Sequence, residues 1–558
     1  MEAKKYSIGI DIGTTFSSIG YYDMAQTEVV VIPVENVEQN NTSSPSWVSL
    51  SQFKSKGVSL VGYSAKKDTE TQYLIFDSKR MIGRKLSDVK YEDKKNWPFG
   101  VEPEKDGSIK IITMNPDTDS EESFYPEEIF AIIIRGLLNK FMEYTSCKLE
   151  DIEHVVITHP AGFEQAQIGA VRSAAMIAGL KKVEFYVEPS AAIVDYIRTC
   201  RTKPTHGSKM VVIDFGGGTL DVSCCTYDAT EGTVECKSKG DPDLGGNNFD
   251  ICFMNAIIEK IYLQNPALED YFKKKKGMTT RQKEEYKRLM LRLRQETERV
   301  KIELSTSDQS EVRMEFIVGK KVVEDNEVMQ PIMTRQDFES ACKELFEKFD
   351  YTVKKILGKF GFTSGVKHTL LVGGSCQIPK IKSLIVKMFN ANVVVPQFDG
   401  MKAVVKGATY LAFSKTQSLV VVKEHVDEPI GFEVKGGKMD PFITEDMTLP
   451  CTAVKRYSTQ YDGQTEAVFK VYKGPEKFVD GMQMKYIGET QIKGIPKKPQ
   501  GVVGFIVKIE LDDSGDMTIY AYLDGNEGLN TRLPLTLTFD RLPQNVETMV
   551  RHTSQFFP

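Results

Sequence analysis

The sequence predicts an α/β protein in which a duplicated domain, with two lobes around a cleft, precedes an all-β sandwich and one short C-terminal helix. Two observations support this fold class. The segments IGIDIGTTFSSIGYY at 8–22 and VVIDFGGGTLDVSCCTY at 211–227 share one plan: an apolar strand, an aspartate, a Gly/Thr turn and a second alternating strand, as in a β-hairpin. After about residue 416, brief alternating runs are separated by turns such as YDGQT, DDSGD and LDGNEG, which is typical of a sandwich.

The repeat places Asp11 and Asp214 at the same point of the two hairpins. This indicates a duplicated domain whose halves face each other across a cleft. Apolar residues recur at helical spacing in 164–180 and 281–304, and the last stretch, 542–556, also predicts a helix. The cleft is the first place to look for function.

Composition excludes several classes of protein. Of the 558 residues, 41% are hydrophobic and 27% are charged, so the chain can bury several cores. A formal charge of -5 supplies no basic field for nucleic acid or an anionic membrane, and neither partner is expected. Apolar runs such as IFAIII at 129–134 fall far short of the ~20 residues that span a bilayer. The first residues lack an apolar signal region, so a cytoplasmic location is expected.

Glycine-rich turns at the hairpin tips are candidate phosphate-binding loops, because backbone amides approach phosphate oxygens closely where no Cβ intervenes. A glycine that only makes the hairpin turn is the alternative for one such loop, but two loops with matched aspartates favour phosphate binding. The candidates at these tips and at two further small-residue turns are Gly13, Thr14, Thr15, Gly216, Gly217, Gly218, Gly245, Gly246, Gly373, Gly374 and Ser375.

Asp11, Asp214 and Asp221 are candidate carboxylates for a cation beside those phosphates. Mg²⁺ keeps most of its waters and needs few carboxylates, so we expect the three to bind it through water. Aspartates that only cap turns are the alternative. With six histidines and no HExxH spacing, a zinc enzyme is disfavoured, and no GxSxG or Cys/His nucleophile signature is present.

The chain contains, in order, the motifs GIDIGTTFSSIG, FDSKRMIGR, ITHPAGFEQAQ, VEPSAA, VIDFGGGTLDVS, GDPDLGGNNFD, LRQETERVKIELS, LLVGGSCQIPKI and GIPKKPQGV. Together they resemble the 70-kilodalton heat-shock chaperone family, within the actin and sugar-kinase fold superfamily. The resemblance covers nearly the whole chain. It implies an actin-like nucleotide-binding domain at 1–416, an interdomain linker at 417–424, a peptide-binding β-sandwich at 425–541 and a truncated lid helix at 542–558.

The same resemblance implies an ATPase that uses ATP or ADP with Mg²⁺. Lys79 would position the attacking water, Thr219 would lie close to the γ-phosphate, and Thr14 and Thr15 would cradle phosphates. The carboxylates implied to orient water or metal-bound water are Asp11, Glu188, Asp214 and Asp221. The implied ribose and adenine contacts are Glu298, Lys301, Ser305, Gly373, Gly374 and Ser375.

The adenine pocket departs from the family pattern. Ile302 and Gln377 stand where the family has two arginines that stack on the base, and Met401 stands where an aspartate is usual. A cation over an aromatic face contributes ~0.5–2 kcal/mol, so losing both would weaken ATP binding about 10- to 1000-fold. We therefore expect weaker ATP binding than in typical family members.

In the predicted sandwich, Phe432, Tyr457, Ala467 and Phe469 match positions of the family's pocket for extended, apolar peptide segments. Packing within the sandwich core is the alternative for such an aromatic set. The single short helix after the sandwich implies that the usual helical lid is almost wholly absent. Bound peptide should then leave quickly.

The expected function is an ATP-dependent chaperone for protein folding under stress, with slow hydrolysis coupled to peptide affinity. One alternative is a non-catalytic or weakly catalytic regulator, such as a nucleotide exchange factor or co-chaperone of another heat-shock chaperone. A small-molecule kinase on the same fold is a second, weaker alternative. J-domain partners are doubtful, since Ile168 replaces a relay arginine and Glu184 and Val187 replace a basic and amide docking face.

Overall fold

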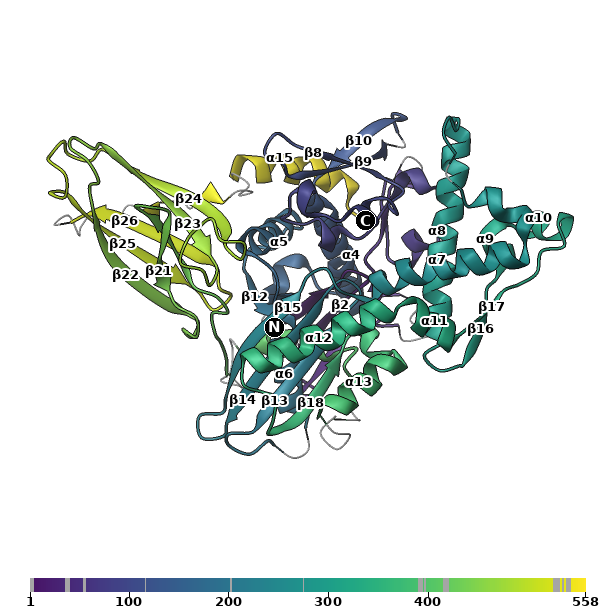
Figure 1. The fold of residues 1–558 in the computed structure, drawn as a ribbon, viewed down its shortest axis with the longest axis horizontal. Helices are drawn as coiled ribbons and strands as arrows, with labels where there is room; N and C mark the ends of the chain where they lie inside the picture. Colours follow the sequence, from purple (N-terminus) through teal and green to yellow (C-terminus); the bar gives the residue numbers. More distant parts are fainter. Residues whose placement is uncertain are drawn as a thin grey trace.

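The computed structural model describes residues 5–558 except 36–40, 54–56, 116, 201–202, 274, 390–394, 396–397, 415–420, 525–531, 534–535 and 538–542. Two α/β halves lie next to each other, and a β sandwich lies to one side of them (Figure 1). The predicted fold class, with its two lobes and its following sandwich, is confirmed.

The first half is organised around a six-stranded sheet. Its order is β12 (Val183–Val187), β11 (Ile152–His159), β1 (Tyr6–Ile12), β2 (Phe16–Asp23) and β3 (Glu28–Val31), with β4 (Ser44–Pro45) paired to β2. β1 runs parallel to β11 and antiparallel to β2. The first predicted hairpin is therefore β1 and β2, and its tip lies at the edge of the sheet where β1 ends.

The second half repeats this plan. Its five-stranded sheet has the order β18 (Val366–Val372), β13 (Lys209–Phe215), β14 (Leu220–Asp228), β15 (Thr233–Asp241) and β19 (Val421–Glu424). β13 runs parallel to β18 and antiparallel to β14, as β1 does to β11 and β2. Asp11 pairs with Ser18 and Asp214 pairs with Asp221 in the two registers. The predicted duplication is confirmed, and the two aspartates occupy equivalent places.

Two helices, α6 (Glu188–Thr199) and α14 (Ala403–Ser414), pack against each other and against both sheets. Their approach is close because Gly407 has no side chain: a Cβ there would lie 1.7 Å from the carbonyl oxygen of Ala191. Apolar residues of the two helices and both sheets form one buried cluster that includes Val156, Ala191, Ala192, Met210, Val212, Leu370, Ala408 and Leu411. This cluster joins the halves and fixes the spacing of the two hairpins.

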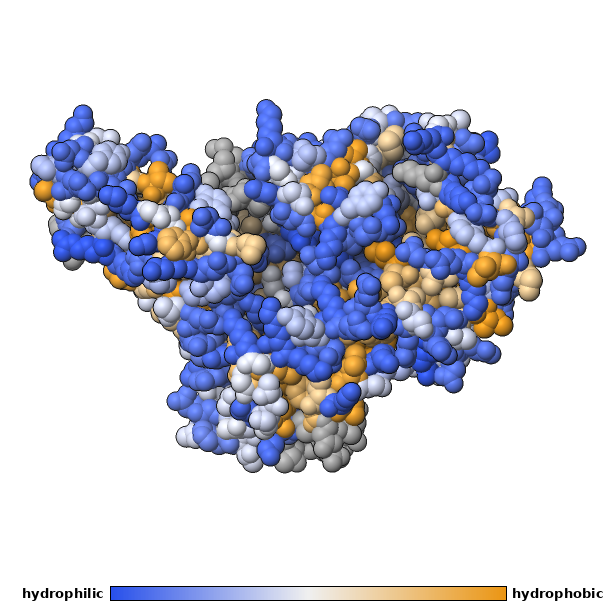
Figure 2. All heavy atoms as spheres, in the orientation of Figure 1, coloured by the Kyte–Doolittle hydropathy of each residue, from blue (hydrophilic) through white to orange (hydrophobic). Residues whose placement is uncertain are grey.

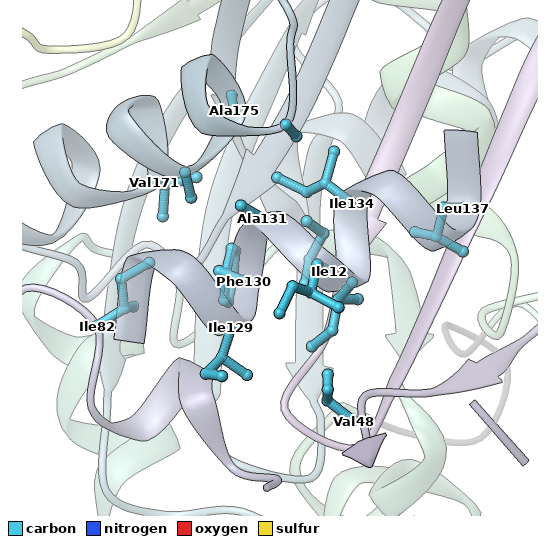
Figure 3. Close-up of a cluster of buried hydrophobic side chains, with 14 of the residues drawn as sticks. Ile12, Val48, Ile82, Ile129, Phe130, Ala131, Ile134, Leu137, Val171 and Ala175 are labelled. Carbon is cyan, nitrogen blue, oxygen red and sulfur yellow. The ribbon is translucent and has the colours of Figure 1, made fainter. Parts of the chain in front are cut away.

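The main core of the first half lies under α4 (Pro126–Thr145) and α5 (Gln165–Ile177). α4 begins after Tyr125, whose backbone N–H donates to the Glu128 carboxylate at 2.8 Å, and proline suits the first turn because its missing N–H would have no partner there. α5 confirms the helix predicted at 164–180. Figure 3 shows Ile12 of β1 among buried side chains of both helices, of which Ile129, Phe130, Ala131, Ile134 and Leu137 come from α4 and Val171 and Ala175 from α5.

Smaller elements complete the first half. They are β5 (Val48–Ser49), β6 (Leu60–Val61), β7 (Leu74–Ile75), β8 (Gly100–Pro103), β9 (Ile109–Asn115), β10 (Ser120–Phe124), α2 (Tyr63–Lys66), α3 (Tyr91–Lys94), and the 3₁₀ turns η2 (Thr71–Tyr73), η3 (Ser78–Arg80), η4 (Leu86–Asp88) and η5 (Leu149–Asp151). The strands β5 to β7 and β8 to β10 form two small separate sheets.

The second half is mostly helical outside its sheet. Its elements are α7 (Gly246–Gln264), η6 (Pro266–Tyr271), α8 (Thr280–Glu303), β16 (Gln309–Glu311), α9 (Met314–Val318), α10 (Lys320–Asp325), β17 (Ile332–Thr334), α11 (Arg335–Ala341), α12 (Lys343–Lys359), η7 (Gly374–Gln377) and α13 (Pro379–Phe389). α8 confirms the helix predicted at 281–304. It starts at a capping box, in which the Thr279 hydroxyl accepts from the Gln282 N–H at 3.3 Å and the Gln282 side chain accepts from the Thr279 N–H at 2.9 Å.

The sandwich consists of two antiparallel sheets. One has the order β21 (Lys438–Ile443), β20 (Ile430–Val434), β23 (Glu466–Lys473), β24 (Lys485–Lys493) and β28 (Thr536–Leu537), and the other β22 (Cys451–Ser458), β25 (Gly504–Leu511), β26 (Met517–Leu523) and β27 (Arg532–Leu533). Along β25, buried residues alternate with more exposed ones, as expected for a strand with one face on a core. Phe505, Val507, Ile509 and Leu511 point into that core.

The sandwich is attached to the two halves at different ends. Before it, β19 pairs in parallel with β15 of the second half; the predicted linker, 417–424, is described only from residue 421. After it, α15 (Pro543–Thr553) packs on α4 and α5 and is followed by η9 (Ser554–Phe556), with Val546, Met549 and Phe556 in the first half's core. The segment predicted as a truncated lid helix, 542–558, thus lies on the first half from residue 543 on (Figure 1).

Figure 2 shows hydrophilic residues over most of one face of the molecule, with hydrophobic residues in small groups between them. Most large apolar side chains are instead gathered in four buried clusters, one per half, one between the halves and one in the sandwich. In the part of the chain that the structure describes, none of the helices combines the length and apolar character that a bilayer crossing requires.

Glu424, at the end of β19, is a buried carboxylate where the sandwich joins the second half. Its two oxygens accept hydrogen bonds from the hydroxyls of Ser190 and Ser238, the latter at 3.3 Å. Burial raises the pKa of Glu424 from its ordinary 4.5 to about 7, the two hydroxyls oppose this shift, and the nearby charge of Asp427 adds to it. The folded protein therefore holds this proton more tightly than the unfolded chain does.

We expect stability to fall as the pH rises from about 4.5 to 7, because over this range the unfolded chain releases the Glu424 proton while the folded protein still retains it. A shift of this size corresponds to about 3 kcal/mol of stability that is lost by neutral pH. Glu424→Gln does not titrate, so the Tm of the wild type should fall relative to that of the variant between about pH 5 and pH 8 in thermal denaturation. Glu259→Gln, at an exposed site on α7, should follow the wild type. A constant Tm difference between wild type and Glu424→Gln would contradict this assignment.

Candidate functional site

A cavity of about 480 Å³ lies between the halves where the two hairpin tips meet. The predicted site residues that line it are Asp11, Gly13, Thr14, Thr15, Lys79, Glu188, Asp214, Gly216, Gly217, Gly218, Thr219, Gly246, Glu298, Lys301, Ser305, Gly373, Gly374 and Ser375. Asp221 and Gly245 lie next to this lining: Asp221 pairs with Asp214 in the sheet, and Gly245 packs on the backbone of Gly217. A larger surface groove of about 660 Å³, against α12 and α13, contains none of these residues.

The two hairpin tips touch each other. A Cβ on Gly217 would lie 1.9 Å from the Thr15 hydroxyl oxygen, and one on Gly218 would lie 2.1 Å from that of Thr14. Only glycine fits at these two positions while the threonines stay in place. The second tip therefore presents bare backbone toward the cavity, which suits close approach to phosphate oxygens.

A buried ion pair lies beside the tips. Lys79, in η3, donates to Glu188 at the start of α6, with Nζ and Oε1 2.5 Å apart. Burial alone would lower the pKa of Lys79, but the carboxylates of Glu188, Asp11 and Asp214 outweigh it, so its pKa is raised. The ammonium group therefore stays charged at the junction of the two halves.

The buried region around Lys79 contains more carboxylate groups than the Lys79 ammonium group alone can neutralise. Burial first, and then the charge of Glu188, raises the pKa of Asp11 and of Asp221 to about 7. The same causes raise the pKa of Asp214 well above its ordinary value. A cavity wall with this excess of buried carboxylates favours a cationic ligand, or an anionic ligand that arrives with a metal ion.

The residues present fit a hydrated divalent cation. Asp221 accepts from the backbone N–H of Gly162 at 3.2 Å through Oδ1, while its buried Oδ2 has no hydrogen-bond partner within the described structure. Among the described residues, no group of three or more His, Cys, Asp or Glu side chains is placed to hold a metal ion directly. Contact with Mg²⁺ through water at Asp11, Asp214 and Asp221 stays a prediction.

Two ion pairs cross between the halves on another side of the cavity. Lys66 of α2 bonds Glu298 of α8 at 2.6 Å, and Asp77 bonds Arg294 of α8 at 2.9 Å. Burial would raise the pKa of Glu298, but Lys66 and other nearby cations outweigh burial and lower it, so Glu298 is ionised. These pairs hold α8 against the first half, and Glu298 also lines the cavity.

The roles of Lys66, Asp77 and Arg294 could not be predicted from the sequence, because their partners lie more than two hundred residues away. Asn247 was also missed; its amide donates to Asp77 at 3.0 Å and its oxygen accepts from Thr15 at 3.3 Å. Asn247 follows the Gly245–Gly246 turn directly, so its place in that motif was the available signal. It links one hairpin tip to the start of α7.

The four predicted peptide-binding residues come together inside the sandwich. Phe432 and Phe469 are buried, while Tyr457 and Ala467 are partly buried against the same core. The ring centroids of Phe432 lie 6.2 Å from Tyr457 and 5.5 Å from Phe469. The Tyr457 hydroxyl donates to the Asp440 carboxylate at 2.8 Å. The structure thus packs these aromatic side chains against one another between the sheets.

The fold and the cavity define a two-lobed protein that presents paired glycine turns, a lysine and buried carboxylates to a ligand between its lobes. The sequence pattern of the Hsp70 protein family matches residues 7–557, and the chain belongs to this family. Members of the family are chaperones that hydrolyse ATP.

Individual relatives agree with this assignment. A heat shock 70 kDa protein of Trichophyton rubrum is 30% identical over 99% of this chain and 80% of its own length. A heat shock 70 kDa protein of Neurospora crassa is 30% identical over 99% of this chain and 81% of its own length. The heat shock cognate 70 kDa protein 3 of Dictyostelium discoideum is 29% identical over 92% of this chain and 78% of its own length. The resemblance seen in the sequence motifs is thereby confirmed.

Gly218→Ala should destabilise the protein, because the added Cβ would lie 2.1 Å from the Thr14 hydroxyl oxygen. Overpacking of this kind costs about 1–3 kcal/mol. Thr14→Ala in the same chain removes the clashing hydroxyl and should recover much of the lost stability, measured as the midpoint of thermal unfolding. Gly169→Ala in α5, where an added Cβ meets nothing within 4 Å, is the control and should not lower the midpoint. Strictly additive effects of the two tip substitutions would show that the tips do not touch.

Proposed function

We propose that this protein is an ATP-dependent chaperone that binds ATP with Mg²⁺ in the cleft, hydrolyses it slowly, and couples this to the binding of extended apolar peptide segments by the sandwich. The observation that carries the proposal is the buried Lys79–Glu188 pair beside Asp11 and Asp214, at the place where two glycine-rich tips meet. Membership of the Hsp70 family supports the same conclusion.

The residues of the cleft suit phosphoryl transfer to water, in which positioning and charge neutralisation account for most of the catalysis. The backbone of Gly216–Gly218 and the hydroxyls of Thr14 and Thr15 would hold the phosphates. Lys79, fixed by Glu188, would orient the attacking water. Mg²⁺, held through water by the aspartates, would neutralise phosphate charge.

Coupling to the sandwich has a structural route. β19 extends the sheet that contains β13 and Asp214, so a movement of the second half carries the start of the sandwich with it. On the first half, Arg172 pairs with Asp516 at 3.0 Å and Glu164 pairs with Lys485 at 2.7 Å. A ligand that changes the angle between the halves would therefore strain the contacts that hold the sandwich to both halves.

The sandwich interior favours a second candidate, a regulator of another heat-shock chaperone that binds nucleotide but takes up peptide weakly. Phe432, Tyr457 and Phe469 already fill the space between the sheets with their own rings. A peptide side chain would have to displace one of these rings. Binding of an extended apolar peptide, compared with and without ATP, separates the candidates, because only the chaperone releases peptide when ATP is added.

Lys79→Ala should abolish most ATP hydrolysis, because the variant lacks the group that orients the water. Loss of such a group typically costs about 10²- to 10⁴-fold. The measurement is single-turnover hydrolysis with Mg²⁺ and excess protein. Lys95→Ala, at an exposed lysine of the same half, should keep the wild-type rate.

The same experiment distinguishes the other functions. A regulator would bind ATP without turning it over in the wild type. A small-molecule kinase would release ADP only when an acceptor is supplied. Equal rates for Lys79→Ala and wild type would remove Lys79 from the mechanism.

A further inference from the structure

We propose that the cleft accepts purine nucleoside triphosphates without choosing between adenine and guanine. This inference rests on the proposed nucleotide-binding function and adds the class of substrate. The residues that support this inference lie at the end of the cavity away from the hairpin tips. The base of a nucleotide would lie there if its phosphates bind at the tips.

The base end of the cavity is formed by α8 with the turn after it, by η7, and by Gly400 and Met401 shortly before α14. Two large apolar side chains reach it from these elements: Ile302 and Met401, which are 56% and 49% exposed. Both remain exposed because no other protein group covers them within the described structure. They offer dispersion contacts to a flat ring, and such contacts do not depend on which substituents the ring carries.

The charged groups at this end are occupied by protein partners. Glu298 accepts a hydrogen bond from Lys66 at 2.6 Å, and Lys301 forms an ion pair with Asp250, with Nζ and Oδ1 2.7 Å apart. Selection of a base requires a donor or acceptor that loses its partner when the wrong base binds. Groups that are already paired within the protein impose no such penalty.

At the mouth of the cavity, Gln377 accepts from the Lys382 ammonium group at 2.7 Å. Both side chains are exposed, so water satisfies their remaining donors whichever base is bound. A hydrogen bond from either one to a base would replace a bond to water, with little net gain. These two residues therefore also discriminate weakly.

The hydroxyl of Ser305, which lines the cavity, is available to a ligand. Ser305 donates to the carbonyl oxygen of Lys301 at 3.5 Å, at the limit of a hydrogen bond, so it can turn to a ligand. A hydroxyl both donates and accepts. It can accept from the amino group of adenine or donate to the oxo group of guanine, and it thus serves both purines.

The test is calorimetric titration of the full chain with ATP, GTP and inorganic tripolyphosphate, each with Mg²⁺. We expect dissociation constants for ATP and GTP within about tenfold of each other, since apolar contacts alone discriminate only modestly between rings of similar shape. Both should be lower than that for tripolyphosphate, because the base adds contacts.

The other outcomes separate two failures. ATP binding with GTP at least about 100-fold weaker would overturn the inference and leave the proposed function standing. Both nucleotides binding no better than tripolyphosphate would overturn it as well, because the base would then make no contact. Failure of both nucleotides to bind would overturn the proposed function itself.

Ser305→Ala provides a second measurement. It should weaken ATP and GTP by the same factor, about two- to tenfold for one hydrogen bond. Ser307→Ala, whose hydroxyl bonds the backbone of Gln309 outside the cavity, is the matched control and should change neither. A loss confined to one nucleotide would show that Ser305 selects the base.

Discussion

The excess of buried carboxylates around Lys79 is the constraint on which the rest of the site depends. Asp11, Asp214, Asp221 and Glu188 come from both halves and share one buried region with the Lys79 ammonium group. Burying several like charges together costs free energy, and the surrounding fold keeps these groups together despite that cost. The matched registers of the two hairpins set the aspartates, and the close packing of α6 on α14 sets the start of α6, where Glu188 lies.

The sequence predicted the parts of this arrangement that have a local pattern. Each hairpin is encoded within about twenty residues by alternation and a glycine turn, so both hairpins and the equivalence of Asp11 and Asp214 could be inferred before the structure. Lys79 and Glu188 lie in a 3₁₀ turn and at a helix start, and they could be found only by resemblance to a family. The Lys66–Glu298 pair joins residues far apart in the chain, so no periodicity indicated it.

In the sandwich and at the base end of the cleft, the sequence indicated which residues are present, and the structure showed what those residues contact. The aromatic residues at 432, 457 and 469 were predicted as pocket positions, and the structure shows that they are also core residues packed on each other. At the base end, the resemblance to the family predicted that Ile302 stands in place of a stacking arginine. Only the structure showed that the polar groups around it are paired with protein.

The two attachments of the sandwich have a mechanical consequence. Its first strand follows β19, which pairs with the sheet of one lobe, and the helix after it, α15, packs into the core of the other lobe through Val546 and Met549. The sandwich is therefore attached to both lobes, one on each side of the cleft. Rotation of one lobe against the other must either break one of these two attachments or rotate the whole sandwich. A rotation too small to open the cleft would therefore still displace the sandwich.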